Sequence, residues 1–253
     1  MKLLAKSRQL NAMLSKVAGQ AVNFTEMAEV LNSTIVANVY VVSRRGKLLG
    51  TAIQWPVEDE WIQTSFVTDG HLNVALNNQL MFGMETNYSN DLAGQLFGVQ
   101  HSNASVCLVP VIGSNKRIGT LLLVRPGQAF VEDDLILAEY GATIVAMEIL
   151  RERLEEEEIE AREKEMVQVA VSSLSYSEQE AVEHIFGELD GQEGLLVASK
   201  VADRAGITRS VIVNALRKLE SARVLESRSL GMKGTYIKIL NTNIYDQLQI
   251  KKA

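Results

Sequence analysis

Five polar side chains between residues 209 and 218 could recognise nucleic acid: Arg209, Ser210, Asn214, Arg217 and Lys218. An arginine guanidinium can pair with two acceptors on the edge of guanine, and an asparagine carboxamide can pair with adenine. Lysine binds phosphate as a point charge. We expect the first three residues to face base edges and the last two to meet phosphates.

A predicted helix positions these side chains. The apolar residues of the same segment are spaced at i, i+4, i+5 and i+8: Val211, Ala215, Leu216 and Leu219. They therefore define a face opposite the polar set. Thr208 is a predicted N-cap. The small residues Ala202 and Ala205, followed by Gly206 and Ile207, are typical of a helix-turn-helix, where two helices approach closely.

A predicted hairpin follows this helix. In VLESRSLGMKGTYIKIL (224–240), two runs that favour strands flank a glycine-containing turn, with Arg228 and Lys233 near its tip. This pattern is typical of a wing that contacts phosphate or the minor groove. The predicted DNA contacts are Ser199, Thr208, Arg209, Ser210, Asn214, Arg217, Lys218, Arg228, Ser229, Lys233 and Thr235. The alternative is a basic helical domain that binds protein, but the spacing, turn glycine, cap, charge and wing agree on a DNA-binding winged helix-turn-helix.

The distribution of charge supports this prediction. The 253 residues carry a net charge of -6, which by itself argues against a nucleic-acid binder. Residues 195–240, however, contain nine basic and three acidic side chains, a net of +6, whereas residues 1–194 sum to -13. A compact basic segment on an acidic chain indicates a polyanion-binding module joined to another domain.

Several classes of protein are disfavoured by what the sequence lacks. It has no P-loop, no Ser/His/Asp or kinase motif, and three scattered histidines without metal-ligand spacing, so we expect neither an enzyme nor a metal site. The single cysteine, Cys107, excludes an intramolecular disulfide and is expected in a buried strand. The sequence contains no run of 18 consecutive apolar residues, so no membrane span is predicted. We expect a soluble, cytoplasmic protein without membrane contact.

The N-terminal half shows a mixed helix and strand pattern. Apolar spacing predicts helices over 3–18 and 25–32, the second opening with a capping box from Asn23 to Glu26. TIVANVYVV, RRGK and LLGTAIQ predict a hairpin, as do ASVCLVPVIG, SNK and RIGTLLLVR. Between the hairpins, residues 55–104 are polar and irregular, with one helix expected near 72–82. We refer to residues 55–104 as the excursion.

A long helix is predicted from about Glu132 to about Leu174. Within it, residues 151–165 hold 12 charged side chains out of 15, which indicates either a connecting helix between domains or a solvated surface helix. The series Tyr140, Ile144, Met147, Leu150 and Leu154 would also suit a short dimer seam. We predict an α+β chain with a sensor domain at 1–131, the connecting helix at 132–174 and the DNA-binding domain at 175–253.

Taken together, these segments closely resemble the CodY family, nutrient-responsive global transcription regulators of low-GC Gram-positive bacteria. The resemblance is strongest in SLSYSEQEAVEHIFGELDGQEGLLVASKVADRAGITRSVIVNALRKLES and in SRSLGMKGTYIKIL. It also extends to SRRGKLLG, RIGTLLLVR and DDLILAEYGATIVAMEILRE. The resemblance implies an N-terminal GAF-type sensor of branched-chain amino acids and a homodimer, with a tetramer left open. It also implies AT-rich palindromic operators and repression of genes needed when nutrients run short.

The resemblance also implies GTP as a second effector. The hairpin turn that begins at Ser43 places Arg44, Arg45 and Lys47 around a glycine, which suits a triphosphate, although an exposed basic turn is the alternative. The family's remaining GTP contacts correspond to Phe24 against the base, Glu148 on the guanine N1 and N2 donors, and Arg153 in place of a lysine.

This chain departs from the family in the excursion. The arginine that pairs with the amino-acid carboxylate in the family corresponds to Trp61, and residues 48–115 contain no lysine or arginine. A buried carboxylate without such a partner costs roughly 1–3 kcal/mol or more. Backbone N–H groups or a protonated His71 could substitute, and we expect Trp61, Ile62 and His71 to line any remaining pocket. Arg223 also stands where the family usually has glycine.

Two hypotheses follow. The first is a repressor gated by GTP, by branched-chain amino acids or by both. The second is a constitutive dimeric DNA-binding regulator whose sensor domain has lost amino-acid binding. A nucleotide-hydrolysing enzyme is disfavoured because no water-positioning residue is identifiable.

Overall fold

The structure is a computed structural model that describes residues 3–17, 23–88, 92–97, 103–189 and 191–248, and for residues 16, 17, 57–59, 61 and 232 the backbone alone. The chain forms two compact units, Met1–Arg153 (unit 1) and Leu154–Ala253 (unit 2), which divide within helix α6 (Glu132–Ser172). The predicted three-part division, with breaks after residues 131 and 174, stays a prediction.

Unit 1 is built on a four-stranded antiparallel sheet in the order β2-β1-β6-β5. The strands are β1 (Asn38–Ser43), β2 (Leu48–Ala52), β5 (Ala104–Gly113) and β6 (Lys116–Pro126), so both predicted hairpins are confirmed. Strand β1 begins later than predicted, because residues Asn32–Val36 form a π-helical turn, η1, in which Val36 has a φ of 63°. This turn carries the chain from the preceding helix into the sheet.

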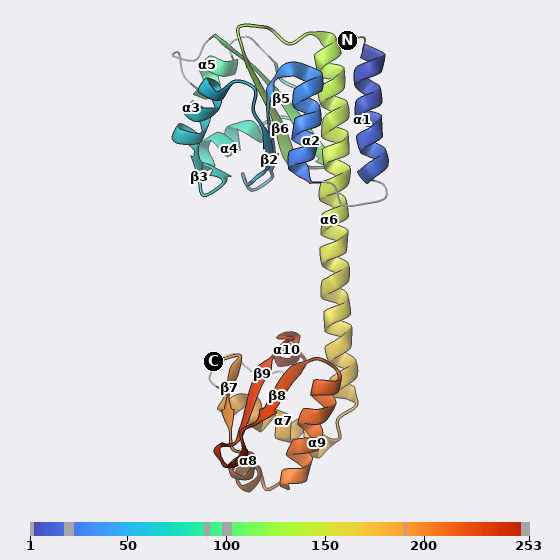
Figure 1. Cartoon of the computed structure of the whole chain (residues 1–253), viewed down its shortest axis with the longest axis vertical. Helices are drawn as coiled ribbons and strands as arrows, with labels where there is room; N and C mark the ends of the chain where they lie inside the picture. The colour runs from blue at the N-terminus through green and yellow to red at the C-terminus, as the bar shows by residue number, and fades with distance from the viewer. Residues whose placement is uncertain (1–2, 18–22, 89–91, 98–102, 190, 249–253) are drawn as a thin grey trace. The chain divides into compact units, whose positions relative to one another are not determined.

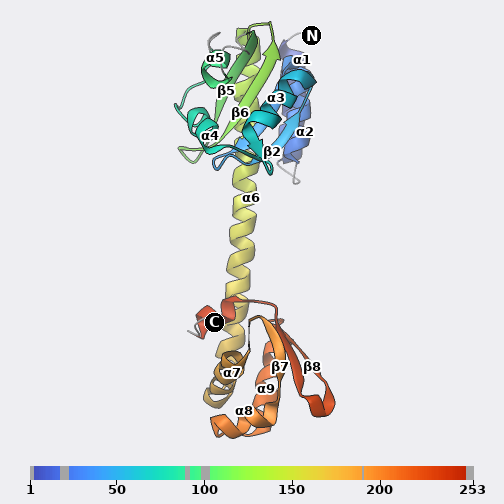
Figure 2. The same ribbon diagram turned by 90° about the vertical axis from the view of Figure 1, so that its left-hand side faces the viewer.

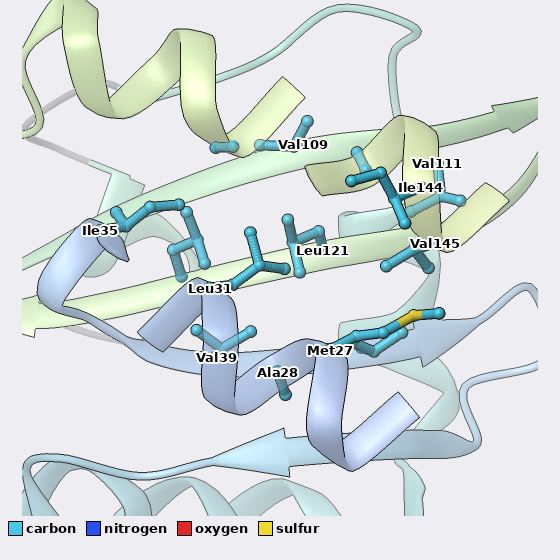
Figure 3. Packing of buried hydrophobic residues seen from close by; sticks show 14 of the residues in the cluster. Met27, Ala28, Leu31, Ile35, Val39, Val109, Val111, Leu121, Ile144 and Val145 are labelled. Atoms are coloured by element: carbon cyan, nitrogen blue, oxygen red, sulfur yellow. The ribbon is translucent and has the colours of Figure 1, made fainter. Parts of the chain in front are cut away.

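One face of the sheet is covered by α1 (Leu3–Val17), α2 (Phe24–Leu31) and the unit 1 part of α6 (Figure 1). Because successive strand residues point to opposite faces, Val39 of β1 and Leu121 of β6 meet Leu31 of α2 and Val145 of α6 on this side (Figure 3). Asn23 is confirmed as the N-cap of α2, but its Oδ1 accepts from the backbone N–H of Thr25 and not from that of Glu26, as the predicted capping box requires.

The described residues of the excursion cover the opposite face, where Tyr40 and Leu122 contribute to a second core (Figure 2). It contains α3 (Pro56–Phe66), β3 (Val67–Thr68), β4 (His71–Leu72), α4 (Val74–Leu80) and α5 (Leu92–Phe97). Helix α4 confirms the helix expected near residues 72–82, whereas α3 and α5 were not predicted. Their sequences lack a clear apolar stripe, because α5 is short and α3 is only weakly amphipathic.

A buried arginine joins β6 to the start of α6. The Arg125 guanidinium donates to Oδ2 of Asp134 at 2.7 Å and to the carbonyl of Ile35 at 3.1 Å, and it lies 4.2 Å from the centre of the Phe130 ring. Asp134 lies in the first turn of α6, as the predicted helix start requires. This cluster fixes the end of η1 against the helix.

Unit 2 has a hydrophobic core of its own. After α6 come α7 (Tyr176–Glu188), β7 (Glu193–Leu196), α8 (Ala198–Ala205), α9 (Arg209–Ser221), β8 (Leu225–Ser229), η3 (Gly231–Lys233), β9 (Thr235–Ile239) and α10 (Asn243–Gln247). The three strands pair in the order β7-β9-β8. Val167 and Val171 at the end of α6 pack with Ile185 of α7 and Ile212 of α9. The end of α6 is therefore part of the core of unit 2.

The long charged helix is confirmed from Glu132 to Ser172. Exposed ion pairs at i, i+4 join Arg162 to Glu158 and Lys164 to Glu160, each at 2.6 Å. Exposed pairs of this kind contribute little stability each, but they favour helix over coil in a segment that buries few apolar residues.

Candidate nucleic-acid interface and effector site

The helix-turn-helix has the geometry that its sequence predicts. Gly206 ends α8 in the left-handed region, with a φ of 66°, and its N–H donates to the carbonyl of Ala202. Ile207 is half-buried and donates to the same carbonyl at 3.1 Å. Glycine is favoured here because side chains with a Cβ rarely adopt this conformation. The tight turn brings α9 against α8.

Helix α9 separates its apolar and polar residues as predicted. Ala215, Leu216 and Leu219 are buried, and the five polar side chains named above are all exposed. Val211, the fourth residue predicted for the apolar face, is only half-buried against the same core, whereas Ile212, which was not predicted, is fully buried. Thr208 occupies the N-cap position, but the predicted cap bond from its side chain is absent, because its hydroxyl is 2.8 Å from the hydroxyl of Ser210. The first turn of α9 therefore keeps backbone N–H groups that no side chain caps.

The wing is the β8–β9 hairpin. Ser229 pairs with Thr235 across it, and the Leu230 N–H donates to the carbonyl of Gly234 at 2.7 Å. Gly231 and Gly234 both have positive φ, and a Cβ at Gly234 would collide with the Leu196 carbonyl of β7. The predicted contacts of α8 and the wing lie as follows: Ser199, Arg228, Ser229 and Lys233 are exposed and Thr235 is half-buried.

Lys218 differs from the other exposed cations of α9. Its Nζ donates to Oε2 of Glu178 at 2.7 Å and to the carbonyl of Ser173 at 2.9 Å. The ammonium that the sequence assigned to phosphate is thus already bound to two acceptors within unit 2. Both partners lie 40 or more residues away in the sequence, so the spacing could not reveal them.

The basic turn of unit 1 is a closed loop between β1 and β2. The Ser43 N–H donates to the carbonyl of Lys47 at 2.8 Å, and the Lys47 N–H returns to the Ser43 hydroxyl at 3.0 Å. Gly46 has a φ of 84°, which explains the glycine within the basic run. The side chains of Arg44, Arg45 and Lys47 are exposed, so three cations project from one short loop.

The other residues predicted for GTP occupy mixed environments. Phe24 is buried at the start of α2, with its backbone against Gly50 of β2. Glu148 is fully buried in α6, and its carboxylate is ion-paired with Arg151, including an Nε–Oε2 bond of 3.0 Å. Arg153 is exposed on α6. Glu148 therefore has a cationic partner three residues on in α6 that was not predicted.

The excursion is hydrogen-bonded to the basic turn, which the sequence also did not indicate. The Leu48 N–H donates to the carbonyl of Gly70, and the Leu72 N–H donates to the carbonyl of Gly46, each at 2.8 Å. The side-chain amide of Asn77 in α4 donates to the carbonyl of Arg44 at 3.3 Å. Helix α4 and the β3–β4 hairpin thereby hold the loop that carries the three cations.

The residues predicted for the amino-acid pocket lie in different environments. Ile62 is buried in the core, whereas His71 is exposed, with its Nδ1 3.0 Å from the carbonyl oxygen of Asp69. The side chain of Trp61 lies outside the described residues. A cavity of about 440 Å³ lies elsewhere on the excursion, and its lining combines four carboxamide residues with apolar ones: Asn78, Gln79, Asn87, Gln95, Phe82, Leu92, Leu96 and Leu108.

One cation reaches the excursion face from outside the cation-free stretch. Arg117 of β6 is buried, and its guanidinium donates to the carbonyl of Leu80 at 2.6 Å and to the hydroxyl of Thr120 at 3.0 Å. It also donates to the carbonyls of Gly83 and Gly119. Burial lowers the pKa of Arg117 from its usual value. The guanidinium donors of Arg117 are therefore already bonded to oxygen atoms of the protein.

Two general findings concern the described part of the chain. Its His, Cys, Asp and Glu residues form no group of three or more that could hold a metal ion. Within that same part, every helix is too short or too polar to cross a bilayer. Cys107 is buried in β5 as predicted, and burial raises the pKa of its thiol to about 12.

Comparisons with known proteins agree with this architecture. Residues 2–173 match the CodY GAF-like domain, and residues 192–252 match the CodY helix-turn-helix domain. The global transcriptional regulators CodY of Anoxybacillus flavithermus and Geobacillus kaustophilus are 57% and 56% identical to this chain. The matches cover 98% of both sequences in the first case and 100% in the second.

Among solved structures, the cofactor-binding GAF domain of the nutrient sensor CodY from Clostridium difficile is 32% identical, with a TM-score of 0.45. The match covers 59% of this chain and 98% of that domain. The predicted α+β class, with a GAF domain, a long helix and a C-terminal helix-turn-helix, is confirmed. The chain belongs to the CodY family of global transcriptional regulators.

Proposed function

We propose that this protein is mainly a repressor of genes needed during nutrient limitation, and that it acts in the cytoplasm as a homodimer, with a tetramer left open, without catalysing a reaction. The DNA sequence that it binds is an AT-rich palindromic operator. The observation that carries this proposal is the exposed polar face of α9, where Arg209, Ser210 and Asn214 project from a helix whose opposite face is buried. Arginine, serine and asparagine side chains at the start of such a helix supply the donors that base edges require.

The remaining predicted contacts surround this face. Arg217 is exposed one turn beyond Asn214, and Arg228 and Lys233 are exposed on the wing. Their positive charge supports phosphate contact, because neutralising phosphates releases counterions and supplies much of the binding free energy. Ser199, Thr208, Ser229 and Thr235 complete the proposed interface as hydroxyl donors to phosphate oxygens.

The proposed effector is GTP, bound at the basic turn of unit 1. Arg44, Arg45 and Lys47 project from a loop closed by its own backbone, so the phosphates meet a preformed cluster of cations. Phe24, Ser43, Glu148 and Arg153 are the further proposed contacts. Because Glu148 is buried and paired with Arg151, guanine recognition there requires that pair to rearrange.

Control by branched-chain amino acids is the weaker part of the proposal. Residues 48–115 contain no lysine or arginine, and the buried cation Arg117 of β6 already binds carbonyl and hydroxyl oxygens. These observations favour a second candidate, a regulator whose sensor no longer binds an amino-acid carboxylate. In that case DNA binding is independent of isoleucine.

Titration calorimetry of the full chain with GTP and, separately, with isoleucine tests both effectors. We expect GTP to bind and isoleucine to give no heat at millimolar concentration. Replacing Arg44 and Arg45 by glutamine, which removes both charges, should abolish the GTP heat, whereas replacing the exposed Arg8 of α1 by glutamine is the matched control. Micromolar binding of isoleucine would contradict the loss of amino-acid sensing and restore the dual-effector model.

A further inference from the structure

A single lysine of the recognition helix α9 connects three segments of unit 2. The ammonium of Lys218 donates to the Glu178 carboxylate in the first turn of α7 and to the carbonyl of Ser173, which follows the last residue of α6. We refer to Lys218, Glu178 and Ser173 as the α9 clip.

The acceptor in this clip is itself fixed. Ser175 and Glu178 form a reciprocal capping box: the Ser175 N–H donates to Oε2 of Glu178 at 2.7 Å, and the Glu178 N–H donates to the Ser175 hydroxyl at 3.4 Å. The Glu178 side chain is 9% exposed and that of Lys218 is 42% exposed. The hydrogen bonds from Lys218 and Ser175 hold the pKa of Glu178 below its usual value. The carboxylate is therefore charged, nearly buried and held in place.

A phosphate contact by Lys218 conflicts with this geometry. If its ammonium turned to DNA, the nearly buried Glu178 carboxylate would lose its cation and one of its hydrogen-bond donors, and a desolvated charge that loses a donor is costly. Arg217, the next residue back, is exposed and makes no such pair among the described residues. The two adjacent cations of α9 therefore differ in their surroundings.

We propose that Lys218 is a positioning residue that fixes α9 against the α6–α7 corner and contributes to operator binding without contacting phosphate. This inference rests on the proposed DNA-binding function and specifies how unit 2 orients its recognition helix. Because base contacts depend on the placement of Arg209 and Asn214, a small rotation of α9 weakens all of them together.

The test compares three variants of the full chain on one duplex, the one that the unaltered protein selects from a random-sequence library. Lys218→Met keeps the aliphatic stem and removes the charge. Glu178→Gln removes the charge of the partner but preserves the capping box, since glutamine also serves at that position. Arg217→Met is the matched control for a true phosphate contact. Circular dichroism is used to choose a temperature at which the unaltered chain and all variants are folded.

The expected pattern is specific to a clip. Lys218→Met weakens binding about tenfold while the slope of log affinity against log salt stays unchanged, whereas Arg217→Met reduces that slope by about 0.9. Glu178→Gln also weakens binding, although it removes a negative charge, and the double variant is no weaker than Lys218→Met alone.

Two results would overturn the inference. One is a salt slope that falls by about 0.9 in Lys218→Met, as for a phosphate contact. The other is unchanged or tighter binding by Glu178→Gln, which charge alone predicts. If the unaltered chain selects no duplex from the library, the proposed DNA-binding function fails instead, so the two failures are distinguishable.

Discussion

Arg223 lies in the left-handed region of backbone conformation, with a φ of 56°, directly after α9. An L residue with a Cβ is strained there by about 1–2 kcal/mol, whereas glycine is not. Replacing Arg223 by glycine would relieve this strain, but part of the gained stability is offset because glycine has more conformational freedom in the unfolded chain. We therefore predict that Arg223→Gly raises the free energy of unfolding of unit 2 by about 1 kcal/mol, measured by urea denaturation.

Arg223→Ala is the control for this prediction, because it removes the same charge but keeps the Cβ. It should leave the stability close to that of the unaltered chain. Equal stabilisation by both variants would show that relief of charge repulsion in the basic segment, and not backbone strain, is responsible.

Arg209 is the residue on which sequence recognition depends most in this account. It is exposed in the first turn of α9, where recognition helices meet base edges. Arg209→Ala should weaken binding to the selected duplex by about 1–3 kcal/mol and broaden the selected sequence at one position. Filter binding and a repeated selection measure both effects. An unchanged affinity would remove Arg209 from the base-reading set.

The single thiol provides a third prediction at this scale. Because burial raises the pKa of Cys107 to about 12, the group is a protonated thiol at neutral and mildly alkaline pH. A disulfide reagent at pH 8 should therefore label the folded chain far more slowly than the chain in urea. Equal rates in the two states would contradict the burial of β5.

At the scale of elements, α4 is hydrogen-bonded to the basic turn. Asn77→Ala removes the amide that donates to the Arg44 carbonyl, so the loop loses one of its constraints. We predict that GTP binds several-fold more weakly to this variant, by calorimetry, because the cations are less preorganised. Asn78→Ala, next to it and exposed, is the control. Equal affinities in the two variants would show that α4 does not hold the turn.

Elements whose signals are local could be predicted from the sequence. Both hairpins, α6, the turn at Gly206 and the wing follow from alternation, helical spacing and glycine placement over short stretches. The start of β1 could not, because the β-branched run from Thr34 also serves a π-helical turn that tertiary packing of Thr34 and Ile35 stabilises.

The candidate sites show the same limit. The exposed face of α9 and the basic turn were predictable, since each lies within a few consecutive residues. The partner of Lys218 and the hydrogen bond from Asn77 were not, because these contacts join residues that meet only in the folded chain. The pair of Glu148 with Arg151 was missed although its i, i+3 spacing within a predicted helix is a local signal. Spacing identifies which side chains can do chemistry, but not which of them the fold has already paired.

At the scale of the whole molecule, the net charge of -6 is the sum of a strongly acidic region and a basic one. Residues 1–194 carry -13 and residues 195–240 carry +6, so the basic module is the part that DNA attracts. The acidic remainder repels phosphates and disfavours non-specific binding elsewhere on the chain. Sequence-specific DNA binding by unit 2 is the central claim, because both the proposed repression and the role of Lys218 depend on it.

The most direct test of that claim is the ratio of two affinities, for the selected duplex and for a random-sequence duplex of equal length. Both are measured by fluorescence anisotropy with the full chain at roughly 150 mM salt. We predict that the selected duplex binds at least about 10³-fold more tightly, as specific binders do. Equal affinities for the two duplexes would contradict the account.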